Sequence, residues 1–412
     1  MPGPLAGTRV LELTTTVAGP MAAMLLADQG AEVIKIEPPR VGDPARYLGN
    51  RRGDISAMFA VLNRNKRSVS LDLKDERQRE IFLSLVDTAD ALVENYRPGK
   101  MEALGLGWDT LSTRNPRLVY ASMTGYGPDG PYQNRRVFDP LIQATSGAAA
   151  LQGEEAPELI RMILYDKVTG LTAAQAVTAA LLQREKTGRG QHLPVSMLDA
   201  ALQFNWPDVM WARTFLGGDA QDPTDLADYF QIFEAKDGPI QVILLADELF
   251  ELFCVWRGSE LHKDPRFATL PARLARRDAF RSAINALLAD VTTAEVCETL
   301  DAMGIPVARV NSLDDVHEDE QVLHRRSLAE SKHPTAGPLR MARPAVEFEG
   351  QDVRSGVFPS RPAPLIGADT RSVLEGIGVP AAEIEALEER DRSHAEQLRG
   401  LFAQQGGSED DG

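Results

Sequence analysis

Short apolar runs alternate with amphipathic segments along the first third of the chain. The apolar runs between positions 8 and 127 are TRVLEL, AEVIKIE, RSVSLDL, ALVENY and RLVYASMTGYG, and each has the length of a buried strand. Between them, GPMAAMLLADQG, residues 75–86 and KMEALGLGWDTL have the apolar spacing of helices. Strands that alternate with helices form parallel sheets with right-handed crossovers. The sequence therefore predicts an α/β fold with a doubly wound, Rossmann-like large domain.

The segment that begins at Asp166 has the pattern of one long buried helix. Val168, Leu171 and Ala174 recur at helical spacing, and Gly188 is typical of a helix end. Asp166 stands where an N-cap is expected, because a carboxylate can accept hydrogen bonds from the free N–H groups of the first turn. From this stretch alone, helix capping is the ordinary interpretation of Asp166.

The pattern changes after residue 205. A polar, turn-rich stretch leads into YFQIFEAKDGPIQVILLA, which is typical of a β-hairpin around Asp237 and Gly238. Amphipathic helical segments follow to about Leu300, and then the strand IPVARV. We expect a first part of the large domain at 1–205, a linker at 206–225, an inserted small α+β domain at 226–320, a linker at 321–345, a C-terminal part that completes the large domain at 346–400, and a disordered tail at 401–412.

The composition is that of an ordinary globular protein, with 43% hydrophobic and 25% charged residues among 412. We see no signal-peptide pattern and no apolar run long enough to span a bilayer. The two cysteines, Cys254 and Cys297, have no pairing or metal-ligand spacing, and the six histidines form no zinc motif. These features predict a cytoplasmic protein with no metal site and no membrane association.

The charge is unevenly distributed along the chain. The net charge of −16 argues against a general nucleic-acid binder. Residues 1–140 carry a net charge of +1, whereas the remainder carries −17. A compact anionic ligand is therefore expected to find its cations in the first third of the chain.

The first strand–helix–strand unit also suits a nicotinamide-cofactor domain, because Glu37 follows its second strand. That domain needs several glycines after the first strand, so that the backbone can approach the pyrophosphate. Here the loop is TTTVAGP, with Gly19 alone. A dinucleotide oxidoreductase is therefore the weaker hypothesis.

Six longer stretches, in a fixed order, carry the most specific signal. They are PLAGTRVLELTTTVAGPMAAMLLADQGAEVIKIEPP, NRNKRSVSLDLK, ADALVENYRPG, NPRLVYASMTGYGPDGPY, REKTGRGQHLPVSMLDAAL and PAPLIGADTRSVLEGIG. Together they resemble the class III CoA-transferase family, which includes formyl-CoA and carnitine CoA-transferases and the related α-methylacyl-CoA racemases. The likeness extends to about residue 378.

This resemblance implies a catalytic role for Asp166, which aligns with the family's nucleophilic aspartate. In the family, this carboxylate attacks an acyl-CoA thioester to form a mixed anhydride, and CoA then passes to an acceptor acid through an enzyme–CoA thioester. Such covalent catalysis divides one difficult exchange into several easier ones. Capping and catalysis are compatible, because a helix N-terminus stabilises a carboxylate.

The same resemblance leaves two alternatives open. The racemases carry a histidine that moves a proton where this chain has Phe138, followed by Asp139. Phe138 cannot transfer a proton, so a racemase is the weaker hypothesis, and we expect Phe138 and Asp139 to line the substrate pocket. A non-catalytic CoA-binding protein is the second alternative, and the presence of Asp166 argues against it.

The resemblance further implies a set of CoA contacts, no tightly bound cofactor, and acyl-CoA and a small carboxylic acid as substrates. The expected CoA-binding residues are Thr16, Val17, Ala18, Arg40, Lys74, Asn95, Tyr96, Lys100 and Arg136. Val17 replaces a glutamine of the formyl-CoA transferases, so formyl specificity is not implied. The glycine-rich lid of that subgroup has no counterpart around PIQVILLADELFELF. The family forms interlocked homodimers, which the two long linkers would suit.

Overall fold

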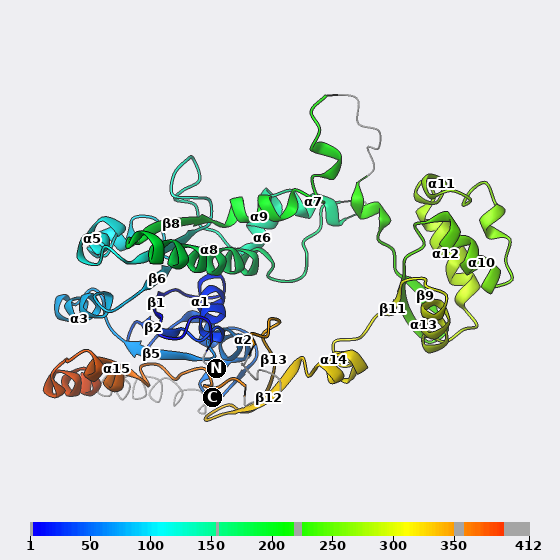
Figure 1. Ribbon diagram of the computed structural model, residues 1–412. Helices are drawn as coiled ribbons and strands as arrows, with labels where there is room; N and C mark the ends of the chain where they lie inside the picture. The colour runs from blue at the N-terminus through cyan, green and yellow to red at the C-terminus, as the bar shows by residue number, and fades with distance from the viewer. Residues whose placement is uncertain (1–2, 154–155, 218–224, 350–357, 391–412) are drawn as a thin grey trace, which may run out of the picture. The chain divides into compact units, whose positions relative to one another are not determined.

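The computed structural model describes residues 3–153, 156–217, 225–349 and 358–390 (Figure 1). The chain divides into two compact units. Of the described residues, the large unit contains 3–150, 158–204, 325–349 and 358–390, and the small unit contains 151–153, 156–157, 205–217 and 225–324.

A six-stranded parallel sheet forms the centre of the large unit. Its strand order is β5-β2-β1-β6-β7-β8. The strands are β1 Arg9–Leu13, β2 Glu32–Glu37, β5 Lys66–Ser70, β6 Ala91–Glu94, β7 Val119–Thr124 and β8 Gln191–Ser196. The predicted α/β fold with a parallel sheet is confirmed. Because the chain runs outward from β1 in one direction and from β6 in the other, β1 and β6 meet at a topological switch point.

Helices cover both faces of this sheet. On one face, α1 (Ala18–Asp28) and α8 (Tyr165–Thr187) lie side by side and bury small apolar residues such as Ala22 and Ala173 against the strands (Figure 1). On the other face, α3 (Glu76–Val86) and α15 (Thr370–Gly376) pack on the larger residues of the same strands. Both faces are therefore apolar, which explains why the strands are near-continuous hydrophobic runs.

One predicted helix, KMEALGLGWDTL, is wrong as a single element. It forms α4 (Lys100–Ala103) and α5 (Trp108–Arg114) instead. Gly105 lies between them with φ +71°, a left-handed conformation that favours glycine and ends a helix. The remaining elements of the large unit are η1 Pro44–Tyr47, β3 Arg51–Arg52, β4 Ile55–Ser56, α2 Ala57–Leu62, α6 Asp139–Thr145, α7 Ala148–Gln152 and α9 Met197–Asn205.

The predicted linker at 321–345 has regular structure. Helix α14 (Glu320–Arg325) begins it, and β12 (Leu328–His333) and β13 (Gly337–Ala342) form an antiparallel hairpin. Residues 206–217 of the other predicted linker contain the short helix η2 (Trp211–Arg213). The tail predicted at 401–412 lies outside the described residues.

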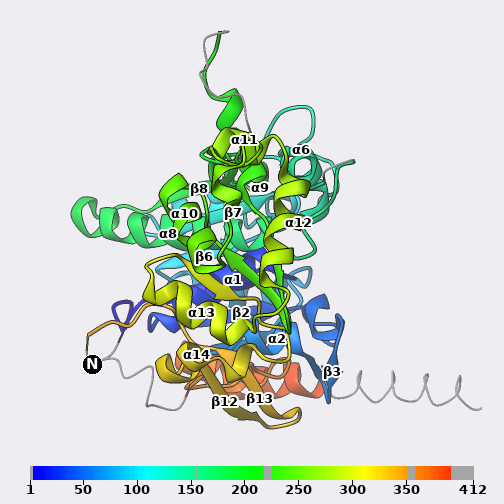
Figure 2. The same cartoon turned by 90° about the vertical axis from the view of Figure 1, so that its right-hand side faces the viewer.

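The small unit has its own three-stranded sheet and core, and its labelled helices can be followed in Figure 2. The predicted hairpin around Asp237 is present, because β9 pairs with β10 in antiparallel fashion and β11 pairs with the other edge of β10. The elements are η3 Leu226–Tyr229, β9 Phe233–Ala235, β10 Gly238–Val242, α10 Asp247–Trp256, η4 Leu261–Lys263, α11 Leu270–Leu274, α12 Arg277–Leu288, α13 Thr293–Ala302, β11 Val307–Arg309 and η5 Val316–Glu318.

Candidate active site

A cavity of about 290 Å³ opens in the large unit at the carboxyl ends of the sheet strands. Open α/β sheets bind ligands at this edge, next to the switch point. The lining comes from the segments after β1 and β6, from the start of α1, from the end of β7 and the residue after it, from the loop before α6, and from the starts of α8 and α9. Its residues are Thr15, Thr16, Ala18, Asn95, Tyr96, Arg97, Pro98, Met123, Thr124, Gly125, Gln133, Arg135, Arg136, Val137, Phe138, Asp166, Thr169 and Met197.

Two loops are joined across the switch point. The backbone N–H of Thr15 donates to Asn95 Oδ1, and Asn95 Nδ2 donates to the Thr15 carbonyl oxygen, both at 2.9 Å. The amide of Asn95 thus pairs with the backbone of the loop between β1 and α1 as another peptide group would. This reciprocal pair fixes the floor of the cavity.

Asp166 is the second residue of α8, so its predicted role as N-cap is wrong. The helix begins at Tyr165, and Leu164 occupies the cap position without a side-chain hydrogen bond. The free N–H groups of this helix end are instead satisfied from a distant segment. Asp139 Oδ2, at the start of α6, accepts from the N–H of Tyr165 at 2.5 Å and from the N–H of Asp166 at 3.2 Å. The Asp166 carboxylate therefore remains available to the cavity.

Gln143 fixes Asp139 and the chain that enters α8. Its Nε2 donates to Asp139 Oδ1 at 2.6 Å, and also to the carbonyl oxygens of Ile160 and Met162 at 3.2 Å. Its Oε1 accepts from the N–H of Ile160 at 2.8 Å. Because Gln143 is 1% exposed and Asp139 is 2% exposed, this arrangement is a rigid support behind Asp166.

The surroundings of Asp166 bring the pKa of its carboxylate close to neutral pH. Burial, together with the negative charge of Asp139, raises the pKa of Asp166 to about 6. The nearby backbone N–H of Ala18 acts in the opposite direction, because it favours the charged form and lowers the pKa of Asp166. Ala18 is the first residue of α1, so the N-terminal ends of two helices meet at this carboxylate, and both attract negative charge.

Arginines supply positive charge around the cavity. The side chains of Arg97, Arg135 and Arg136 line it, and within the described part of the chain none of the three forms an ion pair with a carboxylate. The Arg135 guanidinium lies 3.6 Å from the centre of the Tyr132 ring, which orients it. The cavity thus combines one carboxylate at its base with unpaired cations, an arrangement suited to an anionic ligand.

The family model described as CoA-transferase family III matches residues 5–370, which include the whole cavity. The chain belongs to CoA-transferase family III. This match confirms the resemblance drawn from the six sequence stretches.

Relatives of this CoA-transferase cover most of its length. It is 34% identical to a mouse succinyl-CoA:glutarate CoA-transferase over 91% of this chain and 86% of that protein. It is 35% identical to an acetyl-CoA:oxalate CoA-transferase of Acetobacter aceti over 85% of this chain and 90% of that protein. A CAIB/BAIF family protein from Brucella suis has a similar structure, with a TM-score of 0.78 and 28% identity over 92% of this chain and all of that chain. The protein is therefore an enzyme that transfers CoA to carboxylic acids.

The structure gathers only part of the site predicted for this CoA-transferase. Asp166, Phe138 and five of the expected CoA contacts, Thr16, Ala18, Asn95, Tyr96 and Arg136, line the cavity. Val17 is buried behind it, whereas Arg40, Lys74 and Lys100 are exposed and lie outside the lining. Asp139 is not in the pocket wall as predicted, because its carboxylate faces the end of α8. Thr15, Arg97 and Arg135 were not among the predicted site residues, although Arg135 adjoins Arg136.

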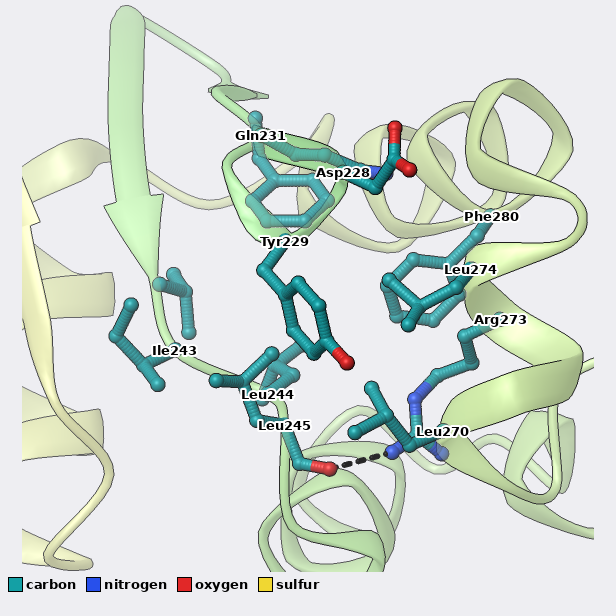
Figure 3. A pocket seen from close by; sticks show the side chains of 12 residues that line it. Asp228, Tyr229, Gln231, Ile243, Leu244, Leu245, Leu270, Arg273, Leu274 and Phe280 are labelled. Atoms are coloured by element: carbon teal, nitrogen blue, oxygen red, sulfur yellow. Dashed lines mark hydrogen bonds between the residues drawn. The ribbon is translucent and has the colours of Figure 1, made fainter. Parts of the chain in front are cut away.

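A second cavity, in the small unit, is lined by leucines and by Arg273 (Figure 3). Its volume of about 30 Å³ holds roughly two water molecules. Arg273 donates to the carbonyl oxygen of Leu245 at 2.9 Å, the dashed line in Figure 3, and pairs with Asp247 at 2.7 Å. Because this cation is neutralised and the space is small, the larger cavity is the better candidate for the substrate site.

Neither a metal centre nor a membrane span is found in the parts of the enzyme that the structure describes. Among these residues, no group of three or more His, Cys, Asp and Glu side chains is placed to hold a metal ion. No helix in the same residues has the length and apolarity that crossing a membrane requires.

Proposed function

We propose that Asp166 is the nucleophile of CoA transfer and that the reaction passes through covalent aspartyl intermediates. The observation that carries this proposal is the position of its carboxylate. It lies at the base of a cation-lined cavity, and its neighbours hold its pKa at about 6, so that the carboxylate is ionised at neutral pH. An ionised carboxylate in this position can attack a thioester carbonyl.

The proposed sequence has four balanced exchanges. Asp166 attacks the acyl carbonyl of the donor, the carbon–sulfur bond breaks, and CoA thiolate leaves an acyl-aspartyl anhydride. The thiolate then attacks the aspartyl carbonyl, which forms an aspartyl–CoA thioester and releases the donor acid. The acceptor acid attacks that thioester, and CoA thiolate leaves a second anhydride. Attack of the thiolate on the acceptor carbonyl gives the new acyl-CoA and restores Asp166.

We further propose that the acceptor carries a second carboxylate. Among the residues that the structure describes, no carboxylate pairs with Arg97, Arg135 or Arg136, so their positive charges remain for the phosphates of CoA and the carboxylates of the acceptor. The names of two relatives include glutarate and oxalate, which are both dicarboxylic acids. Arginine binds carboxylates through paired, charge-assisted hydrogen bonds, so an acceptor with one more carboxylate would gain affinity.

A substrate panel tests this function. Succinyl-CoA or acetyl-CoA is offered with glutarate or oxalate and, as a matched control, with pentanoate, which has the length of glutarate but a single carboxylate. Mass spectrometry then identifies the new acyl-CoA. We expect transfer to a dicarboxylate with a kcat/KM at least about tenfold above that for pentanoate, since one charged hydrogen-bonded pair contributes about 1.5–3 kcal/mol.

Other results of this panel would support the alternatives. Exchange of the α-proton of a 2-methylacyl-CoA without CoA transfer would favour a racemase, and CoA binding without any turnover would favour a non-catalytic protein. Phe138 at the cavity, 68% exposed, supports transfer over proton exchange, because it offers no titratable group. The interlocked homodimer and the cytoplasmic location stay predictions.

CoA transfer is expected to gain rate as the pH rises through about 6, because only ionised Asp166 attacks. Asp139→Asn removes the negative charge that helps to raise this pKa, so the acid limb of kcat/KM should move to lower pH. Profiles of kcat/KM against pH for the wild type and for Asp139→Asn measure this shift of the acid limb. An acid limb at the same pH in both would mean that Asp139 does not act on the titrating group.

A further inference from the structure

A cluster of buried charges lies beneath the loop between β1 and α1. Glu12 on β1, Lys35 on β2, Lys66 on β5 and Asp43 after β2 are each at most 1% exposed. Lys35 Nζ lies 2.8 Å from Glu12 Oε1 and 3.0 Å from Asp43 Oδ2, and Lys66 Nζ lies 2.8 Å from Glu12 Oε2. Two carboxylates and two ammonium groups thus neutralise one another in the interior of the large unit.

Asp43 joins this cluster to the wall of the cavity. Its Oδ1 accepts from the backbone N–H of Thr16 at 3.0 Å and from that of Ala45 at 2.9 Å, while its Oδ2 faces Lys35. Thr16 has φ +72°, a conformation that side-chain-bearing residues rarely adopt. Such a conformation persists where the surroundings hold it. Asp43 holds the N–H of the Thr15–Thr16 peptide, and Asn95 holds its carbonyl oxygen.

The lysines fix the same loop at two further points. Lys35 donates to the Thr14 carbonyl oxygen at 2.9 Å, and Lys66 donates to the Pro20 carbonyl oxygen in the first turn of α1, also at 2.9 Å. These contacts stand on either side of Ala18, which lines the same cavity as Asp166. Buried ion pairs cost desolvation, and packed apolar residues are often at least as stabilising, so stability alone does not account for this cluster.

We propose that Asp43 is a positioning residue for CoA transfer: through its hydrogen bond to Thr16, it holds the segment from Thr16 to Ala18 in place in the cavity wall beside Asp166. This inference rests on the proposed function of Asp166. Its consequence is that Asp43, which does not line the cavity, affects turnover more than it affects the affinity for acyl-CoA.

Asp43→Asn tests the proposal. The carboxylate uses one oxygen for two backbone N–H groups and the other for Lys35, whereas an amide offers a single acceptor oxygen. The NH₂ group of the new asparagine would then face either the backbone N–H groups of the loop or the Lys35 ammonium. Both arrangements place two donors against each other, so we expect the loop to shift. We expect kcat to fall by on the order of 10², the cost of a displacement of about 1 Å at a reacting group. The KM for acyl-CoA should change less than kcat.

Asp28→Asn is the matched control at the other end of α1. The Asp28 side chain is 4% exposed, and both of its oxygens bind Arg64, at 3.2 Å and 2.6 Å. This substitution also breaks a buried ion pair, but one without contact to the loop. We expect it to lower the melting temperature and to leave kcat within about twofold of wild type, as for sites that do not couple.

Two charge-balanced double variants separate positioning from folding. In the double variant Asp43→Asn/Lys35→Gln, the amide oxygen at position 43 can accept from the Thr16 N–H, and its NH₂ group can donate to the glutamine oxygen at position 35. We therefore expect kcat to recover relative to Asp43→Asn alone. In Asp43→Ala/Lys35→Met, the acceptor for Thr16 is absent, so kcat should stay low in a folded protein. This pair decides the question even where Asp43→Asn does not fold.

Wild-type kcat in Asp43→Asn, or equal kcat in the two double variants, would overturn the positioning role. A different result would show that Asp166 is not the nucleophile. In that case Asp166→Asn would be active in the same assay, whatever the activities of the Asp43 variants.

Discussion

Asp166→Asn is expected to abolish CoA transfer, lowering kcat by about four orders of magnitude or more, as removal of a covalent nucleophile does. The amide keeps the shape of the side chain but cannot form an anhydride. The fold should persist, because the start of α8 is capped by Asp139 and does not depend on the Asp166 carboxylate. Steady-state kinetics and calorimetric CoA binding, on protein checked by mass spectrometry for deamidation, measure the effect.

The same variant should be the more stable protein at neutral pH. The pKa of Asp166 is raised in the folded state, so the folded protein binds more protons than the unfolded chain between about pH 4 and 6. The contribution of Asp166 protonation to the free energy of unfolding of the wild type is fully present below about pH 4, and it is lost as the pH rises through 6. Urea unfolding should therefore favour Asp166→Asn by about 1–3 kcal/mol at pH 7, and the difference should shrink toward pH 4.

Asp109→Asn is the matched control for both effects. Asp109 is also the second residue of a helix, α5, but it is exposed and lies outside the cavity. Activity and stability should stay close to wild type. Full activity in Asp166→Asn, or equal loss in both variants, would remove the covalent role from the account.

Gly170→Ala is expected to separate α1 from α8 at the active site. An added Cβ at Gly170 would lie 2.7 Å from the Ala18 carbonyl oxygen and 3.0 Å from Met21 Cβ. The first of these atoms is backbone, so the helices must move apart. Overpacking of this kind costs about 1–3 kcal/mol. Because Ala18 then withdraws from Asp166, which lies one turn before Gly170, kcat should also fall by at least about tenfold.

Gly376→Ala is the control for Gly170→Ala. Gly376 ends α15, and an added Cβ there meets no atom within 4 Å. Its variant should keep wild-type kcat and lose no stability, because alanine restricts the unfolded chain more than glycine does. Melting temperatures and kcat of the two variants give the comparison. Unchanged kcat in Gly170→Ala would mean that the Ala18 contact is dispensable for transfer.

The sheet was predictable because its physical cause is local. Apart from the buried charges Glu12 and Lys35, strands β1 and β2 are apolar on both faces, so their apolar runs are near-continuous, and the helices between the strands keep one apolar side. The break between α4 and α5 was missed because the apolar spacing continues through Gly105, whose left-handed backbone ends the helix.

The geometry of the site was not predictable in this way, because its contacts join distant segments. The donors at the start of α8 are satisfied by Asp139, 27 residues before Asp166, so a local cap rule assigned the wrong role. The Thr15–Asn95 pair spans 80 residues. Lys35 is fully buried only because Glu12 and Asp43 meet it in the fold. The hypothesis that Asp166 is the nucleophile came from a family resemblance and not from local pattern.

Trapping of the intermediate tests the central claim most directly. Hydroxylamine is added to the enzyme during turnover with an acyl-CoA and an acceptor acid, and the digested protein is analysed by tandem mass spectrometry. An activated Asp166 carbonyl, as anhydride or as CoA thioester, should be converted to a hydroxamate, which marks the peptide that contains Asp166. We expect this mark in wild type with acyl-CoA, and its absence without acyl-CoA and in Asp166→Asn. Active enzyme that yields no hydroxamate at Asp166, or yields it on another carboxylate, would contradict the account.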